Sequence, residues 1–380
     1  MSDAMRILLT GGGTGGHVYP ALAVATCGTA DESRSVEFRY VGTSDGLERG
    51  IVAKAGLQFE TVDAGAVRGR SPSAALGGLM RSARGLAQAR RIIDHFRPHA
   101  VLATGGFVCV PVVLAARSRG VPSVVYLPDL RPGWAVRFLA RFASAVAVSF
   151  DEVKPHIPSR RVVVTGYPVR PELMRWSREE ALRKLELPED APVILVIGGS
   201  RGARTINNAV GHELGPLLER AWVVHATGAQ NYQALDERRQ LLPENLQGRY
   251  RLYPYLEDEL APAMAAATLV IARSGASVLG ELPAVGVPGL LVPYPHAGAH
   301  QRLNADFLAR RGVVEIVDDA AAQQGALITS ALELIQSPQR LDRMARAARD
   351  LARPNAAAEL FRLVAEVSSS RVGSSVERLA

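Results

Sequence analysis

A glycine-rich run near the N-terminus ends in a histidine. Gly11–Gly16 holds five glycines in six residues, and His17 follows directly. Backbone amides in a glycine turn that opens a helix favour an anion such as a phosphate. A histidine with a pKa near neutrality can also take a proton from a hydroxyl group. The run predicts a phosphate-binding turn with His17 as a candidate general base. A capping or packing histidine is the alternative.

Two common nucleotide-binding patterns fit this run poorly. No lysine follows the glycines as a P-loop requires, so a P-loop NTPase is not indicated. A bare G-x-G-x-x-G can be read from Gly11, but an NAD site also needs an acidic residue after the second strand. Asp31 and Glu32 lie at about the right distance and yet precede that strand. Dinucleotide binding is therefore disfavoured.

A second group of polar residues follows an apolar run in the other half of the chain. Ser274 and Gly275 come directly after Leu269–Arg273, where a helix start with a serine cap could bind a diphosphate through its amides. Glu281 lies further along that helix, and its carboxylate could accept two hydrogen bonds from a ribose diol. An exposed helix charge is the alternative for Glu281. His300 and Gln301 follow the next apolar run and are suited to contact a sugar.

The elements that must position these residues have the same order in both halves. Short apolar runs at Arg6–Thr10 and Val193–Ile197 each lead into a glycine turn and then a helix-compatible stretch. A buried strand, a glycine turn and a helix form the first unit of a βαβ fold, so the repeat predicts an α/β protein with two Rossmann-like, doubly wound domains. Further strands are expected at Val36–Val41, Ala100–Ala103, Ser123–Leu127, Ala145–Ser149, Val162–Thr165, Trp222–Ala226, Arg251–Tyr253, Leu269–Ala272 and Gly289–Val292, with helices at Ala74–Phe96 and Pro111–Arg119.

Prolines and composition predict the domain limits. Gly166–Pro171 carries two prolines after a strand, which predicts domains at 1–166 and 167–353. Beyond Pro354, one more amphipathic helix is expected at Ala356–Val367, in a C-terminal segment of residues 354–380. The serine-rich stretch from Ser368 to Ala380 is expected to fray.

Composition limits the class of protein. The 380 residues are 48% hydrophobic and 21% charged, as in an ordinary globular protein, and the net charge of +7 favours anionic partners. Cys27 and Cys109 form neither a disulfide framework nor a metal-ligand cluster. No uncharged apolar stretch reaches the ~20 residues that span a bilayer. We expect a cytoplasmic protein whose membrane contact is peripheral.

These motifs together resemble the MurG family of peptidoglycan N-acetylglucosaminyltransferases. The resemblance rests on Gly12–His17, Gly198–Arg204, Arg273–Ala276 with Glu281, and His300–Ala305. It implies the GT-B architecture, in which two Rossmann-like domains face a cleft and a C-terminal helix returns to the first domain. It also implies inverting transfer of N-acetylglucosamine from its UDP form to the muramyl 4-hydroxyl of undecaprenyl-diphosphate-linked lipid I, giving lipid II, with no metal and no cofactor.

The resemblance assigns residues to the two substrates, a UDP-sugar and a polyprenyl-diphosphate lipid. His17 corresponds to the family's candidate base. The residues implied for the donor are Arg170, Ser200, Leu256, Ser274, Gly275, Glu281, His300 and Gln301. Those implied for the acceptor diphosphate are Thr14, Gly15, Gly16, Gly105, Gly106 and Asp129.

The chain departs from the family pattern at three motifs. Tyr126–Asp129 stands where the family has HEQN, Tyr167 replaces the asparagine of GNPVR, and Arg201 replaces the glutamine of GGSQGA. The first departure lies on the acceptor side and leaves open a MurG-like enzyme with a different lipid acceptor. A UDP-N-acetylglucosamine epimerase is a further alternative, because it shares the architecture and the donor.

A basic segment suggests how the protein reaches a lipid. Leu76, Leu79, Met80 and Leu86 alternate with arginines between Arg68 and Arg91, as in helices that bind an anionic bilayer surface. An ordinary crossover helix with a solvated basic face is the alternative. A nucleic-acid-binding module would also explain the positive charge. It is disfavoured, because aromatic residues make up only 6% of the chain and no nucleic-acid motif is present.

Overall fold

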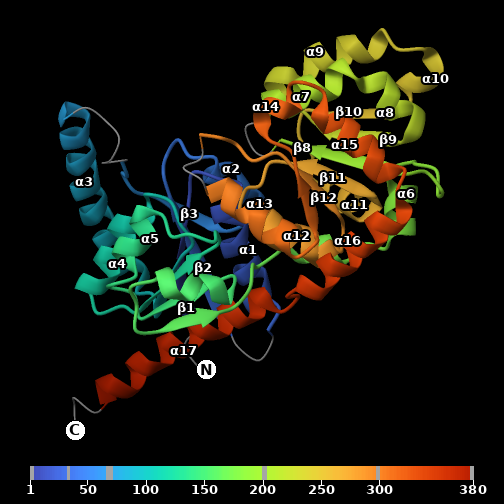
Figure 1. Cartoon of the computed structure of the whole chain (residues 1–380). Helices are drawn as coiled ribbons and strands as arrows, with labels where there is room; N and C mark the ends of the chain where they lie inside the picture. Colours follow the sequence, from blue (N-terminus) through green and yellow to red (C-terminus); the bar gives the residue numbers. More distant parts are fainter. Residues whose placement is uncertain (1–3, 32–34, 66–71, 199–202, 297–299, 377–380) are drawn as a thin grey trace. The chain divides into compact units, whose positions relative to one another are not determined.

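The computed structural model of the chain describes residues 4–31, 35–65, 72–198, 203–296 and 300–376 (Figure 1). The chain divides into two compact units, one made of Met1–Arg170 with Pro354–Ala380 and the other of Pro171–Arg353. The first boundary follows Arg170, whereas the sequence placed it after Gly166. Among the described residues, no helix has the length and apolar character needed to cross a membrane.

The first unit is a parallel sheet of seven strands in the order β3-β2-β1-β4-β5-β6-β7, with helices along it (Figure 1). Its central strands are continuous apolar runs because helices cover both faces of a parallel sheet. Ile7, Leu9 and Leu102, for example, have no exposed surface. The strands are β1 Met5–Thr10, β2 Val36–Gly42, β3 Gln58–Thr61, β4 Ala100–Ala103, β5 Ser123–Leu127, β6 Ala145–Val148 and β7 Val162–Val164. The helices are α1 Gly15–Thr29, α2 Glu48–Lys54, α3 Pro72–Phe96, α4 Cys109–Ser118, α5 Trp134–Leu139 and α17 Ala356–Val376, with a 3-10 turn η1 at Asp151–His156.

The second unit repeats this plan with six parallel strands in the order β10-β9-β8-β11-β12-β13. Its strands are β8 Val193–Ile197, β9 Trp222–Ala226, β10 Tyr250–Tyr253, β11 Leu269–Ala272, β12 Gly289–Leu291 and β13 Val314–Ile316. Its helices are α6 Arg178–Lys184, α7 Arg204–His212, α8 Leu214–Arg220, α9 Ala229–Gln240, α10 Glu244–Gln247, α11 Leu260–Ala266, α12 Val278–Val285, α13 His300–Arg310, α14 Asp319–Ala322, α15 Ala326–Ile335 and α16 Pro338–Leu351, with a 3-10 turn η2 at Pro171–Met174.

The predicted α/β fold class is confirmed in both units. The sequence analysis missed only β3 and β13 among the described strands, and both lie at an edge of their sheet. Edge strands are covered on fewer sides, so they are shorter and more polar than central strands. Gln58–Thr61 and Val314–Ile316 both contain a glutamate, which interrupts the apolar run by which the other strands were predicted.

Each sheet has a point where the strand order reverses. In the first unit, β1 pairs with β2 on one side and with β4 on the other. In the second unit, β8 lies between β9 and β11 in the same way. Ligands of doubly wound folds bind outside the carboxyl ends of the strands at such switch points. The predicted glycine turn after β1 lies at the first switch point. The second predicted turn follows β8 in the sequence, and its residues 199–202 lie outside the described part of the chain.

Helix α17 completes the core of the first unit. The Phe361 ring lies 6.4 Å from the Phe38 ring, and a Cβ added at Gly28 on α1 would lie 2.7 Å from Phe361. An ion pair of 2.6 Å joins Glu366 to Arg161. The helix continues to Val376, past the predicted end at Val367, and Ser368 is buried rather than part of a tail.

Truncating Phe361 tests this packing. We expect Phe361→Ala to destabilise the first unit by about 3–5 kcal/mol, because the lost ring leaves a cavity against Phe38 and Gly28. Urea unfolding followed through the fluorescence of Trp134, which belongs to the first unit, measures the change. Leu241→Ala in the second unit is the control, since Leu241 is 86% exposed. An unchanged midpoint for Phe361→Ala would contradict this role of α17.

Candidate active site

The first glycine turn lies against the loop that follows β4. The Gly12 amide donates to the Gly105 carbonyl over 3.1 Å. Gly13, Gly105 and Gly106 have φ values of +84°, +122° and +89°, a region that favours glycine. A Cβ at Gly106 would lie 2.6 Å from the Gly12 carbonyl oxygen. The two loops can therefore meet at the switch point only because glycine occupies these positions.

His17 lies in the first turn of α1 with a defined proton arrangement. Its Nδ1 is 2.9 Å from the Gly12 carbonyl oxygen and 3.4 Å from the Thr14 hydroxyl. A carbonyl oxygen only accepts, so Nδ1 carries the proton and Nε2 of the neutral ring keeps a lone pair. The ring lies over Gly105, where an added Cβ would be 2.8 Å from Nε2. Nε2 is thus the nitrogen of the half-buried His17 ring that has a lone pair to accept a hydrogen bond.

Two polar residues that the sequence analysis missed hold this turn. Glu48 is fully buried and accepts hydrogen bonds from the Gly13 amide at 3.3 Å and from the Thr43 amide and hydroxyl at 3.0 and 2.8 Å. Thr104 donates its hydroxyl to the His17 carbonyl at 2.5 Å. Buried charges are retained when hydrogen bonds satisfy them. The sequence analysis missed both residues because neither belongs to a glycine motif. The residues next to a carboxylate in the sequence also do not show whether it is buried.

The Tyr126–Asp129 segment comprises the last two residues of β5 and the two residues after it, and β5 pairs with β4 in the sheet. Tyr126 has no exposed surface, and its hydroxyl lies 2.8 Å from the Ser149 hydroxyl. Burial raises the pKa of Tyr126 well above its usual value, so the phenol remains protonated. Leu127 and Pro128 are also buried, whereas Asp129 is half-exposed at the carboxyl edge of the sheet. Within this segment, Asp129 is therefore the residue whose side chain is accessible to solvent.

In the second unit, the start of α12 differs from the prediction. The helix begins at Val278 with Ser277 as its N-cap, so Ser274 does not cap it. Ser274 is fully buried, and its hydroxyl has no partner among the described residues. In the same part of the chain, the amides of Gly275, Ala276 and Ser277 meet no protein acceptor. The backbone of this turn, rather than the Ser274 hydroxyl, is available to an anion.

The other predicted donor residues follow three strands of the same sheet. Glu281 lies half-buried in the first turn of α12. Gln301 uses its side-chain oxygen to accept from the Tyr294 amide at 2.9 Å, which leaves its NH2 group as a donor. His300 begins α13, and Leu256 lies half-buried in the segment after β10. The carboxyl ends of β10, β11 and β12 thus carry these groups, whereas Ser200 lies outside the described residues.

A buried histidine anchors the helix after the second glycine turn. His225 on β9 has its Nε2 3.0 Å from the Asn207 side-chain oxygen and its Nδ1 2.8 Å from the Tyr250 hydroxyl. Asn207 in turn donates to the Thr227 carbonyl at 2.7 Å. Burial lowers the pKa of His225 to about 3, so the ring stays neutral at physiological pH. His225 therefore positions α7 and is not exposed to a substrate.

Two family models match most of the chain. The glycosyltransferase family 28 N-terminal domain matches residues 7–148, and the glycosyltransferase family 28 C-terminal domain matches residues 193–360. The chain belongs to glycosyltransferase family 28. The first match lies within the first unit, and the second covers the second unit from Val193 onwards and continues into residues 354–360 of the first unit.

Relatives within this family confirm the predicted resemblance. The chain is 42% identical to a relative from Roseiflexus sp. (strain RS-1), over 94% of this chain and 93% of the relative. The name of that relative is UDP-N-acetylglucosamine--N-acetylmuramyl-(pentapeptide) pyrophosphoryl-undecaprenol N-acetylglucosamine transferase. The crystal structure of Acinetobacter baumannii MurG has a TM-score of 0.73 and 27% identity, over 95% of this chain and 99% of that one. A putative UDP-N-acetylglucosamine 2-epimerase from Listeria monocytogenes has a TM-score of 0.68 at 18% identity, over 98% of both chains, which shows the fold alone.

Arg273 is part of the family-28 motif, and the sequence analysis gave it no role. Its guanidinium donates to the Val292 carbonyl at 3.0 Å and to Asp319 at 2.5 Å. Asp319 also accepts from the Thr205 hydroxyl of α7 at 3.2 Å. Arg273 therefore ties together the segments after β11, β12 and β13. Arg170, predicted for the donor, belongs to the first unit, where its guanidinium lies 4.2 Å above the Tyr19 ring.

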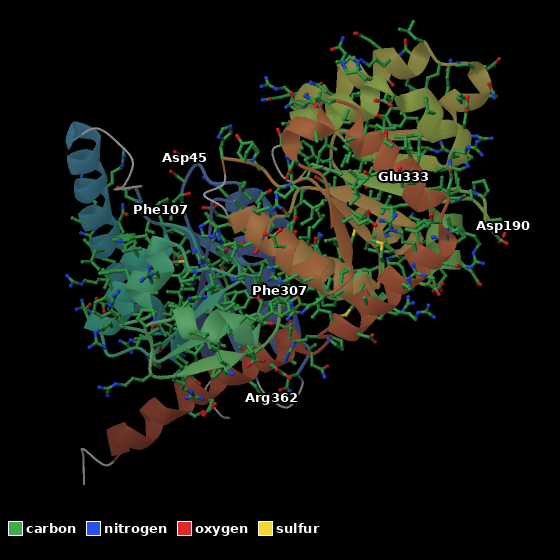
Figure 2. All side chains as sticks on the ribbon, in the orientation of Figure 1. Asp45, Phe107, Asp190, Phe307, Glu333 and Arg362 are labelled. Atoms are coloured by element: carbon green, nitrogen blue, oxygen red, sulfur yellow. The ribbon has the colours of Figure 1, made fainter. Side chains whose placement is uncertain are left out.

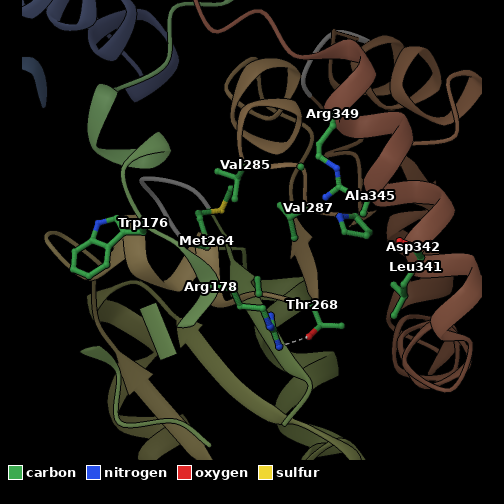
Figure 3. Close-up of a pocket in the computed structure, with 14 residues that line it drawn as sticks. Trp176, Arg178, Met264, Thr268, Val285, Val287, Leu341, Asp342, Ala345 and Arg349 are labelled. Carbon is green, nitrogen blue, oxygen red and sulfur yellow. Dashed lines mark hydrogen bonds between the residues drawn. The ribbon is translucent and has the colours of Figure 1, made fainter. Parts of the chain in front are cut away.

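A pocket of about 400 Å³ in the second unit lies at the opposite, amino-terminal edge of the sheet (Figure 3). Thr268 and Pro288, which precede β11 and β12, line it. Arg178 in this pocket donates to the Ala266 carbonyl at the end of α11, and the stem of Arg349 covers Gly286 at the end of α12. Both cations thus lie at helix C-termini, whose negative dipole ends they complement. This pocket is accordingly a poor place for a diphosphate.

Replacing Gly105 tests the contact with His17. We expect Gly105→Ala to lower glycosyl-transfer turnover on the order of 10²-fold, because the methyl group would displace the imidazole and the φ of +122° strains alanine. Steady-state kinetics give turnover, and UDP titration should show unchanged donor affinity. Gly50→Ala is the matched control, since a Cβ at Gly50 meets nothing within 4 Å. Full activity of Gly105→Ala would show that this glycine does not set the position of His17.

Proposed function

We propose that the protein transfers N-acetylglucosamine from UDP-N-acetylglucosamine to the muramyl 4-hydroxyl of undecaprenyl-diphosphate-linked lipid I, giving lipid II with inversion at the anomeric carbon. The observation that carries this proposal is the 42% identity to a transferase of that name over nearly the whole chain. The geometry supports it, because each unit holds one half of the required chemistry at its switch point.

The base belongs to the first unit. His17 Nε2 takes the proton from the acceptor hydroxyl as the oxygen attacks the anomeric carbon, and the Nδ1–H bond to Gly12 keeps the ring in the required tautomer. The bond from the anomeric carbon to the UDP oxygen breaks at the same time, and its electron pair leaves with the diphosphate. The turn at Thr14–Gly16, with Gly105 and Gly106, supplies backbone amides for the acceptor diphosphate.

The leaving group belongs to the second unit. The amides of Gly275, Ala276 and Ser277 at the start of α12 stabilise the charge that develops on the UDP diphosphate. Glu281 accepts hydrogen bonds from the ribose hydroxyls, while the backbone near Leu256 frames the uracil. Gln301 and His300 contact the sugar. Arg170, which belongs to the first unit, and Ser200, which lies outside the described residues, stay predictions for the diphosphate.

Asp129 has a different part on the acceptor side. A carboxylate repels a diphosphate, so its charge suits hydroxyl or amide donors of the acceptor sugar and peptide better than the phosphate oxygens. We assign Asp129 to those groups and leave the acceptor diphosphate to the amides of the glycine turn.

A transfer assay tests the function directly. Labelled UDP-N-acetylglucosamine with a short-chain lipid I analogue should give a labelled lipid product and one UDP per transfer. An epimerase would convert UDP-N-acetylglucosamine without any acceptor, so dependence of UDP release on the lipid separates the two activities. Tight donor binding without product would mean that the acceptor is a different lipid.

Two substitutions should affect different steps. His17→Ala should lower turnover about 10²–10⁴-fold with donor affinity unchanged, because it removes the base and leaves the second unit intact. Glu281→Ala should weaken UDP binding, measured by calorimetry. Full turnover of His17→Ala, together with weakened UDP binding by that variant, would refute the assigned role of His17 as the base.

We also propose that the protein binds the cytoplasmic face of the plasma membrane as a peripheral protein through its first unit. Arg81, Arg84 and Arg91 on α3 are exposed at helical spacing. Ile92 and Ile93 of the same helix are buried, so the carboxyl-terminal part of α3 packs as a crossover helix with a basic outer side. Arg68 and Arg70 lie outside the described residues, and the side chains of Leu76, Leu79 and Met80 are not described.

Two aromatic side chains of the first unit add an apolar contribution. Phe107, labelled in Figure 2, is 46% exposed directly after Gly106, and Trp134 at the start of α5 is 47% exposed. Exposed aromatic residues suit the interface of a bilayer.

Charge removal on α3 tests the membrane proposal. Each basic residue near an anionic surface contributes about 1 kcal/mol, so Arg81→Ala/Arg84→Ala/Arg91→Ala should weaken binding to phosphatidylglycerol vesicles on the order of 100-fold. Vesicle co-sedimentation at several salt concentrations measures this loss. The control is Arg340→Ala/Arg343→Ala/Arg346→Ala on α16 of the second unit, with the same change of charge. Equal losses of vesicle binding in both triple variants would show a nonspecific charge effect and would contradict binding through α3.

A further inference from the structure

Two of the departures from the family pattern contact each other. Tyr126 stands at the histidine position of HEQN and Tyr167 at the asparagine position of GNPVR. Their rings lie 6.4 Å apart in an edge-to-face arrangement with an interplanar angle of 68°. Such pairs stabilise each other beyond the area they bury. The two replacements therefore form one structural feature of the first unit.

The Tyr126 end of this pair is fixed in the core. Its hydroxyl donates to the Ser149 oxygen at 2.8 Å and also lies 3.3 Å from the Gly166 carbonyl oxygen. The Ser149 hydroxyl in turn donates to the Pro128 carbonyl at 3.1 Å. Gly166 has a φ of +83°, which lets the chain turn between these contacts and Tyr167. Tyr126 thus provides a rigid surface against which the Tyr167 ring is held.

The other end of the pair reaches the turn that carries His17. The Tyr167 hydroxyl donates to the Gly16 carbonyl at 3.4 Å. In an α-helix this carbonyl would accept from the amide of residue 20, but Pro20 lies inside α1 and has no N–H. The α-helical bond that would end on Gly16 cannot form, and Tyr167 supplies a donor from outside the helix.

We propose that Tyr167 is a positioning residue for the catalytic turn, because its hydroxyl gives the Gly16 carbonyl the hydrogen bond that Pro20 cannot. Tyr126 holds the Tyr167 ring in place, and the stacking of Arg170 on Tyr19 attaches the same segment to α1 a second time. The effect on catalysis rests on the proposed function, in which His17 is the base. A phenol and an asparagine amide both carry a donor, so the replacement keeps the hydrogen-bonding capacity of this position.

A double-mutant cycle with Pro20 tests the proposal. Tyr167→Phe removes only the hydroxyl and should lower kcat about 3–10-fold, the modest effect of one long hydrogen bond, with the KM for UDP-N-acetylglucosamine unchanged. Amide hydrogen exchange in residues 14–19 should quicken by a similar factor. Pro20→Ala restores an N–H that can donate to Gly16, so in that background Tyr167→Phe should change both quantities by less than about 2-fold.

Tyr126→Phe is the matched control. It removes the hydroxyl at the Ser149 end of the pair and keeps the Tyr167 donor, so its effects should be the same with Pro20 and with Ala at position 20. Unchanged exchange in Tyr167→Phe, or equal effects of Tyr167→Phe in the two backgrounds, would overturn the positioning role. The exchange measurement needs no substrate, so it decides this proposal even if the wild-type protein transfers no sugar and the proposed function fails.

Discussion

The His17 imidazole lies against the backbone of the loop after β4, and the chemistry of the first unit depends on this close approach. A Cβ at Gly105 would lie 2.6 Å from the His17 ring, and one at Gly106 would meet Gly12 at the same distance. The parallel pairing of β1 with β4 brings the two loops together, and glycine lets them touch. Hydrogen bonds from Gly13 to Glu48 and from Thr104 to the His17 carbonyl then fix the turn. The proton on Nδ1, and with it the basic lone pair on Nε2, follows from that geometry.

The second unit uses the same topology for a different task. Its switch point lies between β8 and β11, and the groups gathered there are backbone amides and the acceptor carboxylate of Glu281. In the proposed reaction these groups bind the nucleotide and stabilise its negative charge. The ion pair of Arg273 with Asp319 connects the segments that follow β11 and β13. The proposed stabilisation of the diphosphate charge therefore relies on oriented amides, which need no reorganisation during the reaction.

The sequence predicted the parts of this arrangement that depend on local pattern. Buried parallel strands are continuous apolar runs, so Leu269–Ala272 and Ser123–Leu127 were predicted at their exact limits. Glycine turns after strands identified both switch points and His17. Local sequence patterns could not predict contacts between distant segments, such as Glu48 with Gly13 or Tyr167 with Gly16. The cap at α12 was assigned to Ser274 because serine is a common cap, but the intervening turn moves the helix start to Val278 and buries Ser274.

A departure from a family motif bears on the substrate only if the altered side chain can reach it. Tyr126, Leu127 and Pro128 are buried, and the Tyr126 hydroxyl bonds within the core. The altered segment therefore changes the packing beneath the acceptor side, and its one half-exposed side chain is that of Asp129. The other groups placed for the acceptor are backbone amides, which do not depend on side-chain identity. Replacement of HEQN here is thus compatible with the proposed diphosphate-linked acceptor, and the proposal leaves discrimination among acceptors to Asp129 and to the turn that Tyr167 supports.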